Sequence, residues 1–298
     1  MMDFAIRLTN VSKHFGAHRA VESVSLTVAP GELVGIVGPD GAGKTTLARL
    51  AAGVLAPSGG TVEPESRGRV GYLSGRFSLY PELTVLENLA FFAKVYGMTA
   101  RETAAETERL LDWVGLLPFK TRLAGALSGG MRQKLALACA VIHQPPTLIL
   151  DEPTTAVDPV ARVDFWVLLQ DQARAERAVL VTTPYMDEAE NCDRVVLLHQ
   201  GRVLATGSSS ELKAQLPYQM ALLIPTEGTT PSRADMAAAA EALPGRRWAI
   251  PLGAGVRVAL DPGAPLAGPP GYTLTAVPTN LEDAYIWLSG AAEEVPAQ

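Results

Sequence analysis

The chain has 298 residues, which is enough for one large domain with a smaller one, or for two domains. Hydrophobic residues make up 48% of it and charged residues 19%, an ordinary balance for a globular protein. The net charge of −6 disfavours a protein that binds nucleic acid, because such proteins usually carry a basic excess. No apolar run approaches the roughly 20 residues of a membrane-spanning helix, so we expect any contact with a membrane to go through a partner or the bilayer surface.

The cysteines and the N-terminus indicate where the chain works. Cys139 and Cys192 lie in apolar or helical surroundings, without the spacing of a metal site. Residues 1–10 show no signal-peptide pattern. We therefore expect reduced, packed thiols and a cytosolic protein.

The N-terminal part of the chain predicts short strands around one loop. The continuous apolar run at residues 33–37 indicates a buried strand, and a helix pattern covers about residues 44–52. Other short strands are expected at residues 4–8, 24–28, 61–62 and 70–73. The segment between the buried strand and the helix is rich in glycine, so it is a loop that the flanking elements hold in place.

This loop matches the phosphate-binding pattern G-x-x-x-x-G-K-[ST]. Its residues are Gly38, Pro39, Asp40, Gly41, Ala42, Gly43, Lys44, Thr45 and Thr46. The glycines let the main chain approach a ligand closely, so that N–H groups form an anion nest in front of a helix N-terminus. Lys44 would reach the β- and γ-phosphates of a nucleotide, and Thr45 would hold Mg²⁺. The alternative is a glycine turn with a chance lysine, which the strand before and the helix after disfavour.

The middle of the chain has helical patterns. Thr84 and Glu87 form a capping box at the start of one apolar helix. Further helices are expected at residues 100–113 and 131–143. A Ser-Gly-Gly sequence at residues 128–130 precedes the last of these helices, so its N-terminus is a second potential anion site.

The next buried strand, at residues 147–150, is followed by two acids, Asp151 and Glu152. A carboxylate at the C-terminal end of a buried strand can accept Mg²⁺-bound water, and the next one can polarise an attacking water. Seen alone, the pattern also fits a strand that ends in two solvated acids. The neighbouring motifs have to decide between these two interpretations.

Strands and helices alternate after this point, which implies a mainly parallel sheet. They are expected at residues 160–174, 178–182, 187–191, 194–198 and 203–204. After residue 216 a weaker pattern predicts a small C-terminal α+β appendage. Its strands are expected at residues 220–224, 257–260 and 272–276, and its helices at residues 234–243 and 281–288. We therefore expect two domains, residues 1–216 and residues 217–298.

The glycine-rich loop, the Ser-Gly-Gly segment and the acidic strand end occur in an order and spacing that is specific to one family. Over about residues 4–216, the chain resembles the ATP-binding subunits of ABC transporters. The resemblance implies an α/β fold with a P-loop NTPase core, a mainly parallel sheet, an antiparallel β subdomain and an α-helical subdomain at about residues 86–130. It also implies ATP and Mg²⁺ as ligands, and ATPase activity.

The resemblance gives each motif a role. The glycine-rich loop is similar to Walker A, and the acidic strand end to Walker B, with Thr45 and Asp151 on the metal side and Glu152 as the catalytic carboxylate. Phe15 stands where the family stacks an aromatic ring on adenine, although core packing is an equal alternative. The D-loop consists of Ala156, Val157 and Asp158. The signature, which would bind the ATP of a partner chain, consists of Leu127, Ser128, Gly129, Gly130 and Met131, with Met131 where glutamine is commonest.

The resemblance also implies partners. Residues 80–85 and 281–284 are similar to the drug- and antibiotic-export branch, and in particular to one half of its tandem ATPase subunits. In this family two ATP-binding domains close head to tail, as a homodimer or a heterodimer, with each ATP between one P-loop and the other signature. The dimer drives transmembrane permease subunits at the cytoplasmic face of the membrane, and no nucleic acid is expected. The permease contact is expected at residues 86–127, with residues 76–83 as one wall.

Two positions depart from the family pattern. Gly75 stands where the family has a glutamine that helps to hold Mg²⁺ and water, and Pro184 stands where it has a switch histidine. Neither replacement has a side chain that can perform those tasks. We therefore expect that the chain's own site hydrolyses ATP slowly or not at all, while its signature completes the site of a more typical partner. The alternative is tolerated drift, in which water or the hydroxyls of Thr182 and Thr183 take over.

Two other functions are compatible with the motifs. A regulatory or structural subunit that binds ATP without turnover would also explain the two departures. A soluble ABC protein that acts on ribosomes or DNA is disfavoured, because the chain has one P-loop, no heptad run and an acidic balance. The motifs do not specify the transported substrate, and they leave open whether the appendage steadies or regulates a dimer.

Overall fold

The computed structural model describes residues 5–64, 70–75, 79–155 and 157–290. It divides into two compact units, Met1–Thr206 and Gly207–Gln298. The division falls about ten residues before the predicted boundary at residues 216/217. The boundary differs because helix α6 (Ser209–Ala214) contacts helix α8 (Leu281–Ser289) and so belongs to the second unit. The sequence shows no apolar periodicity that predicts α6.

A six-stranded sheet forms the centre of the first unit, in the order β5-β6-β7-β3-β8-β9. Its strands are β3 (Leu33–Val37), β5 (Val70–Leu73), β6 (Thr147–Asp151), β7 (Ala178–Thr183), β8 (Arg194–His199) and β9 (Arg202–Gly207). The pairs from β5 to β8 are all parallel, which confirms the predicted mainly parallel sheet. Every residue of β3, β6 and β7 is buried, and this explains why these strands are continuous apolar runs in the sequence.

A three-stranded antiparallel sheet packs beside it, in the order β2-β1-β4. Its strands are β1 (Ile6–Phe15), β2 (His18–Val28) and β4 (Gly59–Pro64). They are longer than the sequence pattern predicts. The pairing of β1 with β2 shifts register between Leu8 and Val11 and again after it, and each such irregularity interrupts the alternation by which a strand is recognised.

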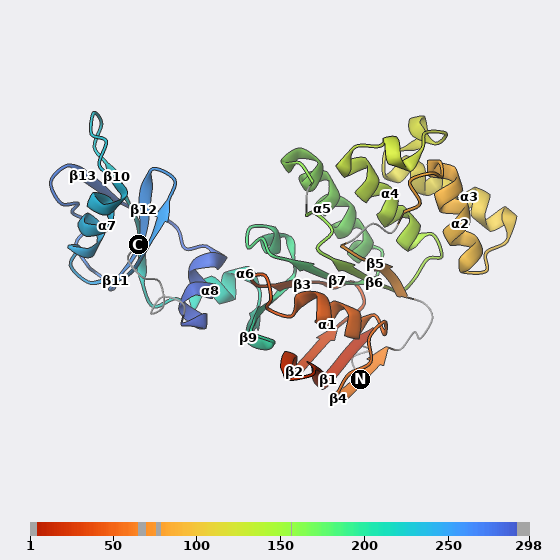
Figure 1. The fold of residues 1–298 in the computed structure, drawn as a ribbon, viewed down its shortest axis with the longest axis horizontal. Coiled ribbons are helices and arrows are strands. Elements are labelled where there is room, and N and C mark those ends of the chain that lie inside the picture. Colours follow the sequence, from red (N-terminus) through yellow and green to blue (C-terminus); the bar gives the residue numbers. More distant parts are fainter. Residues whose placement is uncertain (1–4, 65–69, 76–78, 156, 291–298) are drawn as a thin grey trace. The chain divides into compact units, whose positions relative to one another are not determined.

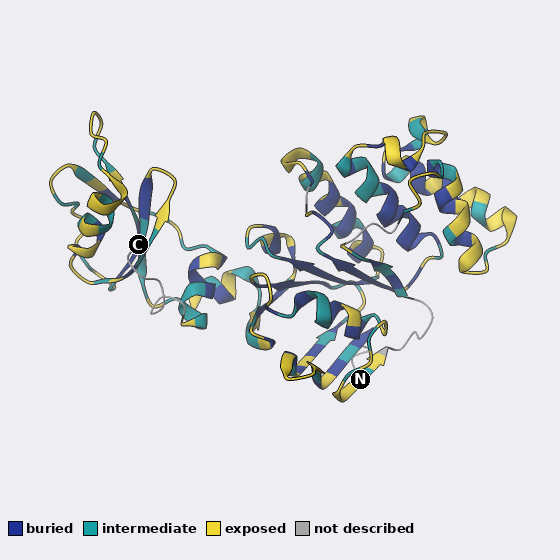
Figure 2. Cartoon of the chain, viewed as in Figure 1, coloured by how far each residue is buried: buried dark blue, intermediate teal, exposed yellow. Residues whose placement is uncertain are grey.

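Helix α1 (Lys44–Ala51) contacts both sheets, while α4 (Gly129–Val141) and α5 (Pro159–Arg174) contact the six-stranded sheet and lie on its other face (Figure 1). The core between the two sheets combines buried residues of both sheets and of α1, which are dark blue in Figure 2. Its fully buried side chains include Ile6, Leu8, Ile36, Leu47 and Leu50. Each such burial stabilises the fold by roughly 2 kcal/mol, so the P-loop at the start of α1 rests on a rigid base.

The helical region contains α2 (Val85–Val95) and α3 (Ala100–Trp113) in addition to α4. The capping box of Thr84 and Glu87 is confirmed, with the Glu87 N–H donating to Thr84 Oγ1 over 3.2 Å and the Thr84 N–H donating to Glu87 over 2.8 Å. Helix α3 is tied to α5 where Trp113 Nε1 donates to Asp171 over 3.4 Å. Among the described residues, no helix combines the length and the hydropathy of a membrane span.

The second unit is a small α+β fold with a four-stranded antiparallel sheet in the order β11-β12-β10-β13. Its elements are α6, β10 (Gln219–Pro225), α7 (Arg233–Glu241), β11 (Arg246–Leu252), β12 (Gly255–Leu260), β13 (Tyr272–Ala276) and α8. Strand β11 is missing from the sequence prediction. It contains Pro251 and lies at an edge of the sheet, where a strand tolerates a residue that cannot donate to the ladder.

A buried ion pair fastens α8 to this sheet. Arg257 of β12 donates through Nε to Asp283 Oδ1 over 2.7 Å, and its Nη2 donates to the other oxygen of the same carboxylate. The side chain of Asp283 is only 1% exposed, and its carboxylate also accepts the N–H of the helix cap Asn280. The hydrogen bond to Asp283 raises the pKa of Arg257, as expected for a planar, bidentate pair.

We expect Asp283→Ala to destabilise the second unit by about 3 kcal/mol, because it leaves a largely buried guanidinium without its carboxylate. Urea unfolding of the full chain, followed by circular dichroism, measures the effect. The matched control is Asp261→Ala, which removes the partner of Arg247 from an exposed pair and should cost less than about 1 kcal/mol. Equal losses in the two variants would contradict the proposed anchoring role.

Candidate functional site

The glycine-rich loop joins β3 to α1, and Gly43 is the N-cap residue of that helix. Gly43 has a φ of 102°, and a Cβ there would lie 2.4 Å from the carbonyl oxygen of Ala20. Only glycine fits this position without strain. The first turn of α1 carries no acidic residue, so its free N–H groups and the helix dipole favour an anion in front of the loop.

Lys44 is buried inside the loop, with only 4% of its surface exposed. Its ammonium donates to the carbonyl oxygens of Gly38 and Pro39 over 2.9 and 3.1 Å, and lies 3.2 Å from Glu152 Oε1. A buried cation needs such partners. The phosphates of a nucleotide are the type of anion that can take the place of the glutamate.

Thr45 and Asp151 face each other across the end of the sheet. The Thr45 hydroxyl donates to Asp151 Oδ1 over 3.0 Å, and Thr182 donates to the same oxygen over 2.9 Å. Asp151 is 3% exposed. A hydroxyl and a carboxylate in contact fit Mg²⁺, which prefers oxygen ligands from one or two side chains together with substrate phosphates.

Glu152 has an unusual backbone. Its φ is +48°, in the left-handed region that side chains other than glycine rarely adopt. Its N–H donates to both the carbonyl oxygen and the hydroxyl of Thr182, over 3.1 and 3.0 Å, which holds the strained turn in place. Such strain concentrates at functional sites, and here it directs the carboxylate of Glu152 toward Lys44.

Phe15 ends β1 and is 51% exposed, so the ring does not pack in the core of the described chain. The ammonium of Lys13 lies 5.3 Å from the centroid of the ring. The neighbouring strand β2 contacts the P-loop through Ala20, which places the β1–β2 hairpin beside the loop. Stacking of Phe15 on adenine stays a prediction.

The signature forms the start of α4, where Ser128 is exposed. Ser128 is the N-cap residue, and its Oγ accepts the Met131 N–H over 3.2 Å. Leu127 is buried, and Gly130 packs so closely on α5 that a Cβ would lie 2.6 Å from the Ala161 Cβ. Because α1 and α4 lie on opposite faces of the six-stranded sheet, one chain does not wrap both helix N-termini around one phosphate group.

The D-loop leads into α5. Asp158 is the N-cap residue of this helix, and its Oδ1 accepts the Ala161 N–H over 3.0 Å. Val157 is buried. Ala156 lies outside the described residues, as do residues 76–78 of the predicted permease wall.

The two departures from the family pattern lie beside these groups. Gly75 follows β5, and a Cβ there would lie 2.8 Å from the carbonyl oxygen of Asp151. Pro184 follows β7 directly after Thr183. The Thr183 hydroxyl donates to the buried carboxylate of Glu188, which also accepts from Thr154 Oγ1 over 2.9 Å.

Sequence reasoning assigns no role to Glu188, although it lies in the same segment as Pro184. Asp187 stands beside Glu188 and Glu190 lies two residues further on, so no local pattern in the sequence singles out Glu188 as the buried acid. Tyr72 is a second missed neighbour of the site. Burial, and to a lesser degree the charge of Asp151, raise the pKa of its phenol.

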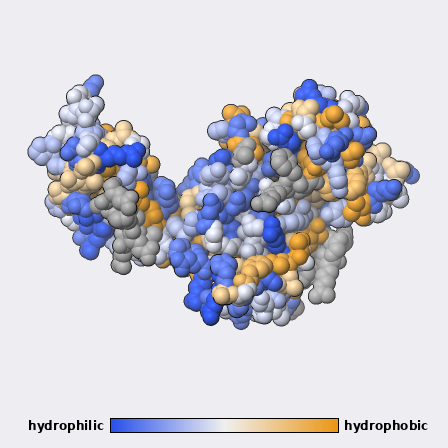
Figure 3. Space-filling view, viewed as in Figure 1, coloured by the Kyte–Doolittle hydropathy of each residue, from blue (hydrophilic) through white to orange (hydrophobic). Residues whose placement is uncertain are grey.

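The predicted permease wall is held by a buried amide. Asn88 of α2 is fully buried, and its Nδ2 donates to the carbonyl oxygens of Tyr80, Leu83 and Thr84 over 3.0 to 3.2 Å. Its Oδ1 accepts the Tyr80 N–H over 2.9 Å. Tyr80 is partly exposed and meets Phe91 edge to face at 4.6 Å, and hydrophobic surface is visible over this helical region in Figure 3.

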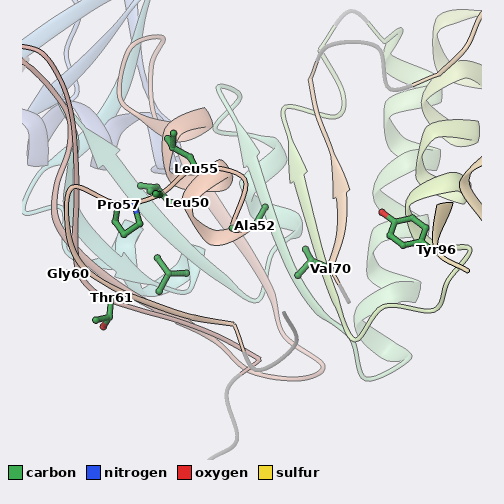
Figure 4. A pocket seen from close by; sticks show the side chains of 11 residues that line it. Leu50, Ala52, Leu55, Pro57, Gly60, Thr61, Val70 and Tyr96 are labelled. Carbon is green, nitrogen blue, oxygen red and sulfur yellow. The ribbon is translucent and has the colours of Figure 1, made fainter. Parts of the chain in front are cut away.

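A separate cavity of about 590 Å³ lies at the other end of α1 (Figure 4). Most of its lining is apolar. The labelled lining residues are Leu50, Ala52, Leu55, Pro57, Gly60, Thr61, Val70 and Tyr96. None of the predicted site residues is among the described residues that line it, so it is distinct from the phosphate site.

Comparison with known proteins gives the same family throughout. A family model described as ABC transporter matches residues 21–155. The probable multidrug ABC transporter ATP-binding protein YbhF of Escherichia coli strain K12 is 38% identical over 220 residues, which cover 70% of this chain and 38% of that protein. The chain therefore matches well under half of the length of this relative. Nod factor export ATP-binding protein I of Burkholderia orbicola is 34% identical over 302 residues, which cover 96% of this chain and 97% of that protein.

Solved structures agree with these relatives. The structure of an ATP-binding subunit of an ABC transporter is 29% identical with a TM-score of 0.64, and the match covers 71% of this chain and 92% of that one. A dimeric structure of MJ0796, a bacterial ABC transporter cassette, is 27% identical with a TM-score of 0.63, covering 68% of this chain and 98% of that one. The chain thus belongs to the ATP-binding subunits of ABC transporters.

Proposed function

We propose that this ABC transporter subunit binds Mg–ATP at its own P-loop and drives an exporter together with a second ATP-binding domain. The observation that carries the proposal is the convergence of Lys44, Thr45, Asp151 and Glu152 at one edge of the sheet. Bound Mg–ATP would supply the phosphoanhydride bond and a counter-charge for its phosphates. The names of the relatives, which mention multidrug and Nod factor export, favour export as the direction.

Each residue has a task in this proposal. Lys44 exchanges Glu152 for the β- and γ-phosphate oxygens, and the glycine-rich loop donates its N–H groups. Thr45 and Asp151 supply the oxygen ligands on the metal side. Once released from Lys44, Glu152 is free to orient a water molecule, although its strained backbone keeps it at the edge of the site.

A head-to-tail dimer completes the site. The exposed Ser128 and the N-terminus of α4 have the geometry of an anion site, but they belong to a helix on the far side of the sheet from α1. A second cassette that offers its P-loop to this signature would satisfy both surfaces. Nucleotide would then hold the dimer together, and its loss would release it.

We propose further that the partner is a different, more typical cassette, because the chain's own site is impaired. Thr182 donates to Asp151 and accepts the Glu152 N–H, and Thr183 donates to Glu188 and accepts the Tyr185 N–H. Both hydroxyls are therefore engaged and cannot replace the histidine missing at Pro184 without breaking these bonds. The same observation supports a second candidate function, a subunit that binds ATP but never hydrolyses it.

The permease would contact the helical region at the cytoplasmic face of the membrane. The surface around Tyr80 and Phe91 offers exposed aromatic rings on a segment that Asn88 holds rigidly. An amphipathic helix of a permease would bury its apolar side on such a surface. The transmembrane subunits, and not this chain, would then select the substrate.

Lys44→Ala should weaken ATP binding by the isolated chain about tenfold to a hundredfold, the scale of a lost hydrogen bond to a charged group. Titration with a fluorescent ATP analogue measures it. The control is Lys134→Ala, which removes a lysine paired with Asp164 on the surface of α4 and α5 and should leave the affinity unchanged. Wild-type protein without affinity for ATP would overturn the proposed function.

Turnover by the purified chain alone should be at least about a hundredfold slower than turnover by the chain with its partner, the scale of one missing transition-state contact. Pro184→His should raise the rate of the isolated chain by about tenfold, whereas Pro184→Ala should not. Fast hydrolysis by the wild-type homodimer would refute the impaired site. In the assembled transporter, Glu152→Gln separates the two candidates, since unchanged transport would favour the subunit without hydrolysis.

Phe91→Glu should reduce co-purification with the permease about tenfold or more, because it places a charge in the proposed apolar contact. ATP binding by the isolated variant should be unchanged. The control is Val54→Glu, at an exposed position after α1 that lies outside the helical region. If both variants retained the permease equally well, the contact would lie elsewhere.

A further inference from the structure

A buried carboxylate connects three segments around the nucleotide site. Glu188 begins a 3-10 helix (Glu188–Asn191) and is 3% exposed. Its Oε2 accepts from Thr154 Oγ1 over 2.9 Å and from Thr183 Oγ1, and its Oε1 lies 3.3 Å from Arg162 Nε. The contact of Glu188 with Arg162 is an ion pair without hydrogen-bond geometry, while the two threonines donate hydrogen bonds. A buried carboxylate needs such partners, so moving any of the three segments away would leave the charge of Glu188 less compensated.

One of the three partners, Arg162, is on α5, the helix that follows the D-loop. Arg162 lies in the first turns of α5, four residues after the cap Asp158, and its guanidinium also stacks 4.4 Å from the ring centroid of Tyr185. The segment that follows Pro184 therefore holds this arginine on two sides, with an aromatic ring and with a carboxylate. This contact fixes the start of α5 to the end of β7.

The same turn of α5 touches the signature. Ala161, the neighbour of Arg162, packs directly on Gly130, where there is no room for a Cβ. On the other side of Glu188, Thr183 follows Thr182, which donates to Asp151, and Thr154 lies two residues after Glu152. Contacts of Glu188, together with short stretches of main chain, thus link the proposed Mg–ATP ligands to the signature of the same chain.

We propose that Glu188 is a positioning residue that couples occupancy of this chain's P-loop to the placement of its own signature and D-loop. The inference rests on the proposed function, because the signature serves the ATP of the partner. When ATP takes Glu152's place at Lys44, the end of β6 that contains Asp151 would shift. Because Glu188 is bonded to Thr154 and Thr183 beside this site and is paired with Arg162, the start of α5 would shift with it. Gly130 of the signature packs on Ala161 of α5 and would follow. A site that hydrolyses poorly would in this way still control the competent site across the interface.

Hydrogen–deuterium exchange of the isolated full chain tests this without a partner. Peptides covering residues 127–134 and 157–166 are followed with and without saturating Mg–ATP. In the wild type, ATP should slow their exchange at least about threefold. In Glu188→Gln and in Arg162→Gln this response should disappear, while the affinity for ATP stays within about threefold of the wild type.

Matched variants separate coupling from damage to the fold. Arg174→Gln removes an arginine from the exposed end of the same helix, where it pairs with Asp171, and should keep the full response. The double variant Glu188→Gln/Arg162→Gln should resemble the single variants, because both remove one and the same link. If Glu188→Gln does not fold, Arg162→Gln, whose side chain is partly exposed, provides the same comparison.

The outcomes separate the two proposals. A wild type that binds ATP but shows no change in either peptide, or variants that keep the change, would overturn the coupling and leave the proposed function intact. A wild type that does not bind ATP would overturn the proposed function itself. A response lost in both charge variants and kept in Arg174→Gln would support the coupling through Glu188.

Discussion

A cation buried at the start of α1 is the constraint on which the nucleotide site depends. The ammonium of Lys44 is almost fully buried, so the loop has to surround it with carbonyl oxygens, and the end of β6, two strands away from β3, has to offer Glu152. Because β6, β7 and β3 are neighbours in one parallel sheet, their carboxyl ends bring the acids and the loop to one edge. In the proposed function, ATP binding would begin with the exchange of Glu152 for phosphate oxygens at Lys44.

The same fold supports the proposed dimer. The N-termini of α1 and α4, the two proposed phosphate contacts, start helices on opposite faces of the sheet, so one chain would not bring both to one phosphate. The polar groups between them already have partners. Thr182 donates to Asp151, and Glu188 accepts from Thr183 and Thr154 and pairs with Arg162. Such a network is costly to break in part, so its members are expected to move together or not at all.

Much of this was accessible from the sequence, for identifiable reasons. The parallel strands are buried on both faces and are therefore recognisable as continuous apolar runs. The start of α2 is predictable because the capping box of Thr84 and Glu87 depends only on residues three positions apart. The full length of β1 and the whole of β11 could not be predicted, because register shifts interrupt the alternation in β1 and a proline lies in β11. Pairing with neighbouring strands, which local sequence does not record, stabilises both. Glu188 and Asn88 could not be assigned roles, since their partners are distant in sequence or are backbone groups that no residue pattern records.

A side chain at position 75 would meet the carbonyl oxygen of Asp151, and this limits which residues the position accepts. In this backbone the position has no room for even a methyl group, so a later substitution that restores glutamine would push against the very strand that carries the metal-side acid. Restoring a glutamine here would therefore require the end of β5 or the carbonyl of Asp151 to move as well, so a single substitution at Gly75 would not be enough.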